Sequence, residues 1–281
     1  MKQVVQARLQ RYWDIRAAGN FSFGGTGSGL VLAAALALAL GVASPWAVAV
    51  GLGFIGLGLF CVWLEIGKPW RAINVLFHPH TSWMTREALL VPPLMAAGAA
   101  AVLIDIRFVY LAALFAAGFM YCQARMLLAS RGIPAWCQKE IVPLILATAL
   151  AEGAGAFLVA GGRPQALIVV ALVAGILREI ARVLYRKGLV AAKLPAATLK
   201  WMASREEKGL TALRGLSLAC LALALAGVAP TALAIAGGSL AVLAGWGLKA
   251  VIIVRAAFTR GQVISHTPTR GRGPTAIVIP S

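Results

Sequence analysis

Apolar runs, each about as long as the roughly 20 residues that a helix needs to cross a bilayer, recur along this whole sequence. Only a helix or a closed barrel satisfies its backbone hydrogen bonds within hydrocarbon. The runs are rich in Ala, Leu, Val and Gly and lack period-two alternation, which argues against a barrel. We therefore predict an all-α integral membrane protein, a bundle of eight transmembrane helices. The predicted spans are 27–45, 46–66, 88–104, 109–127, 141–160, 164–182, 210–228 and 229–254.

Basic residues predict how these spans are oriented. The formal net charge is +17, and Lys and Arg gather in alternate connections, including eight between Arg178 and Lys208 and a group that starts at Lys249. By the positive-inside rule, both termini and the long loops lie in the cytoplasm, and the protein is a multi-pass protein of the cytoplasmic (inner) membrane. The charge thus indicates topology and contact with membrane lipid or a protein partner, and we expect no nucleic acid.

The spans divide the chain into three parts. Residues 1–22 form a cytoplasmic or interfacial N-terminal segment, 23–258 the transmembrane domain, and 259–281 a cytoplasmic tail that we expect to clamp a partner subunit. Val5, Leu9 and Trp13 would share one face of a short interfacial helix in the first part. A solvated arm is the alternative for this segment.

Cysteine and histidine positions limit the metal chemistry of the chain. Its four cysteines are widely separated and lack a cluster-binding spacing, so we expect no iron–sulfur cluster in this chain. The histidines His78, His80 and His266 fall in predicted loops or the tail, whereas a membrane cytochrome b holds haem between mid-membrane histidines. We therefore expect no haem and no metal site.

The connection 65–89, EIGKPWRAINVLFHPHTSWMTREAL, is the part of the membrane-adjacent chain richest in polar, aromatic and charged residues. Its tryptophans also fit an ordinary interfacial belt. Its charged residues Glu65, Arg71, Arg86 and Glu87 also fit a structural ion-pair network, which lowers the cost of burial.

This connection and the glycine-rich FSFGGTGSGL before it resemble the polysulfide reductase membrane-subunit superfamily, which includes the anchor of dimethyl sulfoxide reductase. In that family His-Leu-Gly-x-Pro-x-Arg is followed by Ser-Trp-x-x-Arg-Glu; here the two motifs begin at Glu65 and Ser82. The departure is Glu65 where the family often has His. The segment RYWDIRAAGNFSFGGTGSG is similar to anchors of phenylacetyl-CoA:acceptor oxidoreductase complexes.

The resemblance implies the membrane anchor and quinone-binding subunit of an oxidoreductase complex, itself non-catalytic toward the substrate. A four-cluster iron–sulfur subunit and a molybdopterin or tungstopterin catalytic subunit would be its partners, and electrons would pass between the iron–sulfur subunit and ubiquinone or menaquinone. A quinone pocket needs apolar walls, hydrogen-bond donors and ionisable groups that deliver protons. The candidates for quinone binding or proton transfer are Arg16, Asn20, Glu65, Arg71, His80, Trp83, Arg86, Glu87, Tyr121 and Arg125, with Gln123 beside the last two.

Two other classes fit part of the sequence. A secondary transporter is the main alternative, since Glu152 lies within the fifth span, either as a neutral hydrogen-bonded acid or on a proton path. An enzyme that modifies lipid head groups with His80 and Glu87 is the third class. In the sixth span Arg178 and Arg182 share a helix face, and we expect them to snorkel or to form ion pairs.

Overall fold

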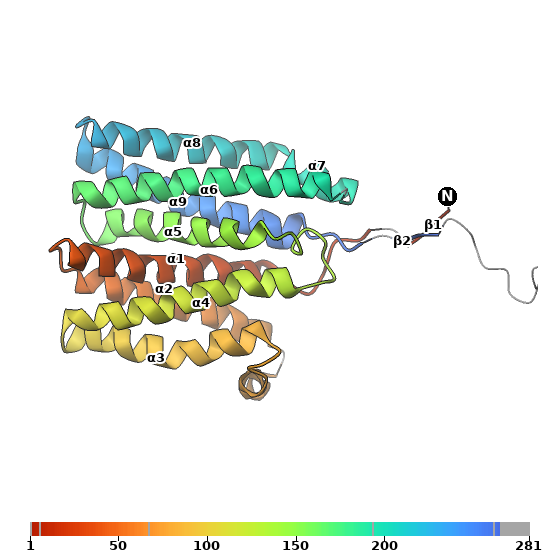
Figure 1. Ribbon diagram of the computed structural model, residues 1–281, viewed down its shortest axis with the longest axis horizontal. Helices are drawn as coiled ribbons and strands as arrows, with labels where there is room; N and C mark the ends of the chain where they lie inside the picture. The colour runs from red at the N-terminus through yellow and green to blue at the C-terminus, as the bar shows by residue number, and fades with distance from the viewer. Residues whose placement is uncertain (1, 6, 67, 193, 261, 265–281) are drawn as a thin grey trace, which may run out of the picture.

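Long helices run side by side in the computed structural model, which describes residues 2–5, 7–66, 68–192, 194–260 and 262–264 (Figure 1). The α-helices are α1 (Ile15–Ala39), α2 (Pro45–Glu65), α3 (Trp83–Leu103), α4 (Val109–Ala129), α5 (Ile141–Ala160), α6 (Gln165–Ala191), α7 (Ala196–Met202), α8 (Arg205–Leu225) and α9 (Pro230–Ala250). The shorter elements are the 3₁₀ helices η1 (Pro69–Phe77) and η2 (Ile106–Phe108), the π-helical turn η3 (Val251–Arg255) and the strands β1 (Lys2–Val5) and β2 (Gln262–Ile264).

The length and composition of the helices are those of a multi-pass membrane protein. Within the described ranges, seven helical segments are long and apolar enough to cross a bilayer: α1, α2, α3, α4 with η2, α5, α8 with α7, and α9 with η3. Helix α6 is also long, but its middle carries Arg178, Glu179 and Arg182. The predicted fold class, an all-α membrane protein, is therefore confirmed, while the predicted number of eight spans is not.

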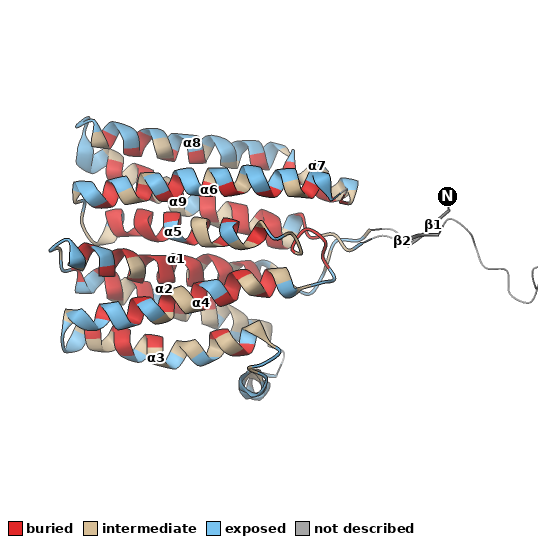
Figure 2. Cartoon of the chain, in the orientation of Figure 1, coloured by how far each residue is buried: buried red, intermediate tan, exposed pale blue. Residues whose placement is uncertain are grey.

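Helices α1 and α5 form the centre of the bundle. Helix α1 packs against α2, α4, α5 and α9, and α5 packs against α1, α4, α6 and α9. Figure 2 shows the buried residues concentrated along these central helices, while α3 and α8 turn much of their surface outward. Small residues allow the close approach of helices. The Gly29 and Gly153 backbones, for example, meet so closely that a Cβ at either position would overlap the backbone of the other helix.

Gly153→Ala tests this packing. The added methyl group would overlap the Gly29 backbone, which cannot rotate away as a side chain can. We expect a loss of about 1–3 kcal/mol in the free energy of unfolding, measured by thermal unfolding of the detergent-solubilised protein. Gly53→Ala in α2 is the matched control, because the Cβ there would meet open space. Equal stability of the two variants would contradict the close packing.

Several predicted boundaries are wrong. Helix α1 begins at Ile15 and not at 27, because the Asp14 carboxylate accepts a hydrogen bond from the Arg16 amide and caps it. The glycine-rich segment therefore lies inside α1. Helix α3 begins at Trp83 and not at 88, since Ser82 accepts a hydrogen bond from the Thr85 amide. Both errors arise because polar residues fill the first turns of these helices.

The interfacial helix predicted for the N-terminal segment is also wrong. Residues 2–5 form β1, which pairs antiparallel with β2, and Leu9 bridges to Phe258. Trp13 then packs its ring against Phe21 and Trp136. These strands lie at the same end of the bundle as η1 and α7, while short turns close the other end (Figure 1). The predicted clamp falls largely on 265–281, outside the described residues.

Candidate functional site

A cavity of about 300 Å³ lies where the first turns of α1 and α3 meet the end of α2. It is called the α1–α3 cavity below. Its wall is mostly apolar, and three polar side chains interrupt it: Asn20, Glu65 and Glu87. The apolar part of the wall consists of Trp13, Ala17, Phe21, Leu59, Val62, Ile66, Val75, Met84, Ala88 and Met126. An apolar pocket with a few convergent polar groups is the usual form of a small-molecule site.

Two of the polar residues on the cavity wall, Asn20 and Glu87, form a cluster with Gln123, which lies behind the wall. All three residues are buried, and the Asn20 and Gln123 side chains lie beside the Glu87 carboxyl group. The Gln123 amide donates to the backbone oxygen of Asn20 at 3.2 Å. The atoms Glu87 Oε1 and Asn20 Oδ1 find no hydrogen-bond partner within the described part of the chain. A buried carboxyl and a buried amide on the cavity wall can therefore bind the polar groups of a ligand.

Glu65 is the third polar residue of the cavity wall and the last residue of α2. Its side chain is partly exposed, unlike that of Glu87. The cavity wall thus carries one buried ionisable group, Glu87, and one partly exposed ionisable group, Glu65.

Four of the predicted residues form a separate aromatic and basic cluster. The Arg86 and Arg125 guanidinium carbons lie 4.2 and 4.5 Å from the Trp83 ring centroid. Tyr121 packs edge-on against Trp83, and its hydroxyl accepts a hydrogen bond from Arg125 at 2.8 Å. None of the four lines the cavity. Aromatic rings packed against arginines in this way are typical of side chains that anchor a helix at a membrane interface.

The remaining predicted residues lie outside the cavity. Arg16 forms an ion pair with Asp14 at 2.8 Å and donates a hydrogen bond to the backbone oxygen of Leu64 at 2.7 Å. It therefore connects the start of α1 to the end of α2. Hydrogen bonds from Arg16 lower the pKa of the Asp14 carboxyl group. Arg71 and His80 are exposed.

The ion-pair network proposed for the 65–89 connection is wrong. Among the described residues, no ion pair joins Glu65, Arg71, Arg86 and Glu87. Arg86 instead donates to the backbone oxygens of Pro79 and His80, at 2.7 and 2.8 Å, and so holds the loop before α3. Its charge is satisfied by carbonyl groups and the Trp83 ring, which leaves Glu87 free to face the cavity.

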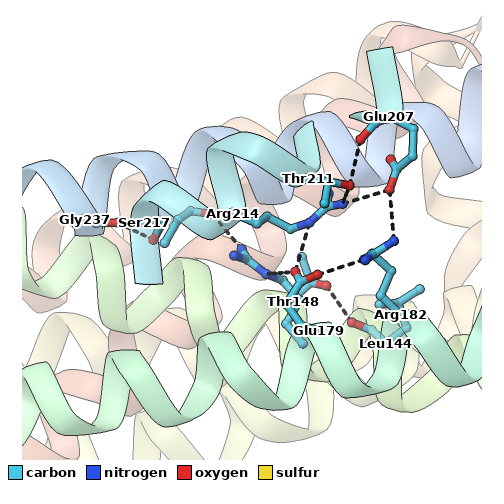
Figure 3. A network of polar contacts seen from close by, with 11 residues as sticks. Leu144, Thr148, Glu179, Arg182, Glu207, Thr211, Arg214, Ser217 and Gly237 are labelled. Carbon is cyan, nitrogen blue, oxygen red and sulfur yellow. Dashed lines mark hydrogen bonds and ion pairs between the residues drawn. The ribbon is translucent and has the colours of Figure 1, made fainter. Parts of the chain in front are cut away.

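A second polar feature, which the sequence analysis largely missed, lies in the other half of the bundle. Lys249 was counted with the basic residues of a cytoplasmic connection, but it lies in the last turn of α9, fully buried, with its ammonium 2.7 Å from Glu152. Arg178 and Arg182 lie within α6, the predicted sixth span, and both form ion pairs with Glu179. Figure 3 shows the pair of Arg182 with Glu179. The signals in the sequence were Glu152 within the fifth span and the Arg-Glu-x-x-Arg spacing of the sixth span.

No protein-family model matches this sequence, and the search of curated proteins found no similar sequence. The function therefore has to be inferred from the geometry of the cavity and from the motifs around it.

Proposed function

We propose that this chain is the membrane anchor and quinone-binding subunit of a molybdopterin or tungstopterin oxidoreductase complex. The observation that carries the proposal is the α1–α3 cavity, whose apolar walls end in the Asn20, Glu87 and Gln123 cluster. Two segments that carry the resemblances supply much of its wall. Residues 11–29, which resemble anchors of phenylacetyl-CoA:acceptor oxidoreductase complexes, contain Asn20, and the segment from Glu65 to Glu87 resembles the polysulfide reductase membrane-subunit superfamily.

The chemistry of a quinone fits this wall. Its ring is flat and apolar, and its two carbonyl oxygens accept hydrogen bonds, so the ring suits the side chains around Ala17 and Phe21. The Asn20 amide can donate to one carbonyl oxygen. Reduction takes two electrons and two protons, and Glu87 is placed to exchange a proton with the ring oxygen, with Glu65 as the group nearer to water.

The helix η1 extends the site toward a partner. It lies across the end of the bundle, where Figure 1 shows it nearly end-on, and Val75 from it lines the cavity. Its outer face exposes Trp70, Ile73 and Phe77. Exposed aromatic and apolar side chains beside a site suit a contact with a protein or with the membrane interface. We place the iron–sulfur subunit at this end, within reach of the cavity.

Helix α6 supports the proposed membrane topology. We propose eight membrane spans, namely the seven segments described above and α6. Helix α6 exposes Leu177, Ile180 and Leu184, while Arg178, Glu179 and Arg182 in its middle form ion pairs. Both termini would then be cytoplasmic, as the basic connections predict. The iron–sulfur and catalytic subunits would lie on that side and act on an intracellular compound.

Purification of the full-length chain from its native membrane tests the anchor function. We expect two further subunits in stoichiometric amounts, together with iron and with molybdenum or tungsten, measured by metal analysis of the purified particle. A matched preparation with Trp70→Ser and Phe77→Ser should lose these subunits if η1 contacts them, while α1 to α9 remain folded. A pure, folded chain without partner subunits or metal would contradict the anchor function.

A secondary transporter remains the second candidate, because charged residues lie buried between α5, α6, α8 and α9. Intramembrane ionisable groups often mark ion pathways. The purification separates the two candidates, since a transporter has no reason to retain an iron-containing partner.

A further inference from the structure

Buried charged residues form two adjacent groups inside α5, α6, α8 and α9. In the first, Lys249 Nζ lies 2.7 Å from Glu152 Oε2, and both side chains are fully buried. In the second, shown in Figure 3, Arg214 contacts Glu179 at 2.9 Å and Glu207 at 2.8 Å. Arg178 and Arg182 complete this second group, each paired with Glu179. Together these seven residues are called the buried ion chain.

The two groups meet on α9. Arg178 donates from Nη1 to the backbone oxygen of Ala241 at 3.0 Å. Glu152 rests against Gly245, where a Cβ would overlap its carboxyl group. Ala241 and Gly245 are four residues apart on the same helix, which is about 6 Å along its axis. The charge of Arg178 therefore acts directly on the Glu152–Lys249 pair.

The number of charges in the buried ion chain does not balance. It holds three arginines (Arg178, Arg182, Arg214) and three glutamates (Glu152, Glu179, Glu207), and Lys249 is the seventh member. An arginine keeps its charge in proteins, whereas a buried lysine readily loses its proton. With all carboxylates ionised, the chain is neutral when Lys249 is an amine and carries one excess positive charge when it is an ammonium.

The chain also offers a route to water. Its outer member is Glu207, in the first turn of α8, and the neighbouring residues Arg205, Glu206 and Lys208 are exposed at that end of the bundle. Several of its atoms, including Glu152 Oε1, Arg178 Nη2 and Glu207 Oε2, are buried without a hydrogen-bond partner from the described ranges. Buried polar atoms of this kind are normally hydrogen-bonded to internal water. Water held between the ion pairs would let a proton move along them.

The inner end of the chain touches the wall of the α1–α3 cavity. Lys249 Nζ donates to the backbone oxygen of Phe21 at 2.9 Å, and Phe21 lines that cavity. Gly25, one turn further along α1, leaves room for the ammonium group, because a Cβ there would overlap it. A charge that develops in the cavity therefore lies close to Lys249.

We propose that Lys249 and Glu152 form a buried proton-exchange site, and that the buried ion chain connects this site to water at the start of α8. The Lys249 ammonium releases one proton to water within the chain and becomes an amine; Glu179 and Glu207 pass the proton outward. Uptake follows the reverse route. The role that we assign to this site is to hold a proton while a reduced quinone in the cavity carries negative charge. This role rests on the proposed function, whereas the existence of the site does not.

The groups that face the pair determine when it titrates. Arg178 approaches from α6, and Glu179, Arg182, Arg214 and Glu207 follow from α6 and α8. Helix α1 contributes Thr26, whose hydroxyl donates to Glu152 at 2.9 Å. On the cavity side, the charged group is Glu87 of α3, beyond Asn20 and Gln123.

Nitrogen NMR of the full-length protein, labelled with ¹⁵N at lysine Nζ and reconstituted in liposomes, tests the proposal. Ammonium and amine nitrogens have different shifts, and the signal lost in Lys249→Met identifies Lys249. Exposed lysines titrate near pH 10.4. We expect the Lys249 signal to titrate separately from these, because its nitrogen is buried and contacts Glu152 and the Phe21 backbone oxygen.

Charge variants sharpen this test. Arg178→Gln removes one fixed positive charge, so we expect Lys249 to keep its proton to a higher pH; Glu179→Gln should have the opposite effect. Arg107→Gln, at an exposed site in the turn before α4, is the matched control and should leave the titration unchanged. A Lys249 signal that titrates with the exposed lysines, or ignores Arg178→Gln and Glu179→Gln, would overturn the proton-exchange site. If Lys249 titrates as described but no quinone binds, the site stands and the proposed function fails.

Discussion

Lys249→Met is expected to destabilise the protein by about 3–5 kcal/mol, because it leaves the Glu152 carboxylate buried without its ion-pair partner. Glu152 would keep only the Thr26 hydroxyl as a hydrogen-bond donor among the contacts now seen at its Oε2 atom. Lys249 also fastens α9 to the Phe21 carbonyl of α1, and that hydrogen bond is lost as well. Thermal and denaturant unfolding of the detergent-solubilised protein measure the loss.

The double variant Lys249→Met with Glu152→Leu is the control for this prediction. Replacement of both members of a buried ion pair by apolar residues is often neutral or stabilising. We therefore expect the double variant to recover most of the stability that Lys249→Met loses. The loss in Lys249→Met should also be smaller in acid, because a protonated Glu152 carries no charge to bury. If the single variant were as stable as the native protein at neutral pH, the buried ion pair would be contradicted.

Ala17→Phe is expected to raise the Kd for a quinone by at least about tenfold, which corresponds to about 1.4 kcal/mol of binding free energy. Ala17 is buried on α1 and lines the α1–α3 cavity, so a phenyl ring there occupies the space proposed for the quinone ring. Trp13 lines the same cavity, and bound quinone should quench its fluorescence. Titration with short-chain ubiquinone and menaquinone analogues, with Trp13→Phe as the reference for the quenched signal, measures the affinity.

Ala96→Phe controls for the added ring. Ala96 lies on the exposed face of α3, away from the cavity wall, so the same change there should leave the quinone affinity unchanged. Equal affinities for Ala17→Phe, Ala96→Phe and the native protein would place the quinone elsewhere. Thermal unfolding of each variant separates a lost site from a lost fold.

The positions of the helices could be predicted from apolar runs, but their starts could not. Runs of Leu, Val and Ala locate α5 at its observed residues, because no polar residue interrupts them at either end. At the start of α3, in contrast, Arg86 and Glu87 occupy the first turns, and hydropathy alone places them in a loop. The capping residues Asp14 and Ser82 were the better signal for these starts.

The candidate site was predictable only in part, for a related reason. Asn20, Glu65 and Glu87 do line one cavity, because the two motif segments meet where α1, α2 and α3 pack. Trp83 and Arg86 belong to the same motif but lie in a different cluster; Arg86 directly precedes Glu87 in α3, and successive side chains point about 100° apart around a helix. The Glu152–Lys249 pair joins residues far apart in sequence, and a single sequence carries no signal for such a contact.

Photoaffinity labelling with an azido-quinone, followed by mass spectrometry of the labelled peptides, tests most directly whether the α1–α3 cavity binds a quinone. We expect the label on the start of α1, between Trp13 and Phe21, and on the start of α3, between Met84 and Ala88. Excess unlabelled quinone should compete for both peptides, and Ala17→Phe should remove the label from them. Labelling spread over the lipid-facing helices, or confined to peptides remote from this cavity, would contradict quinone binding at this site.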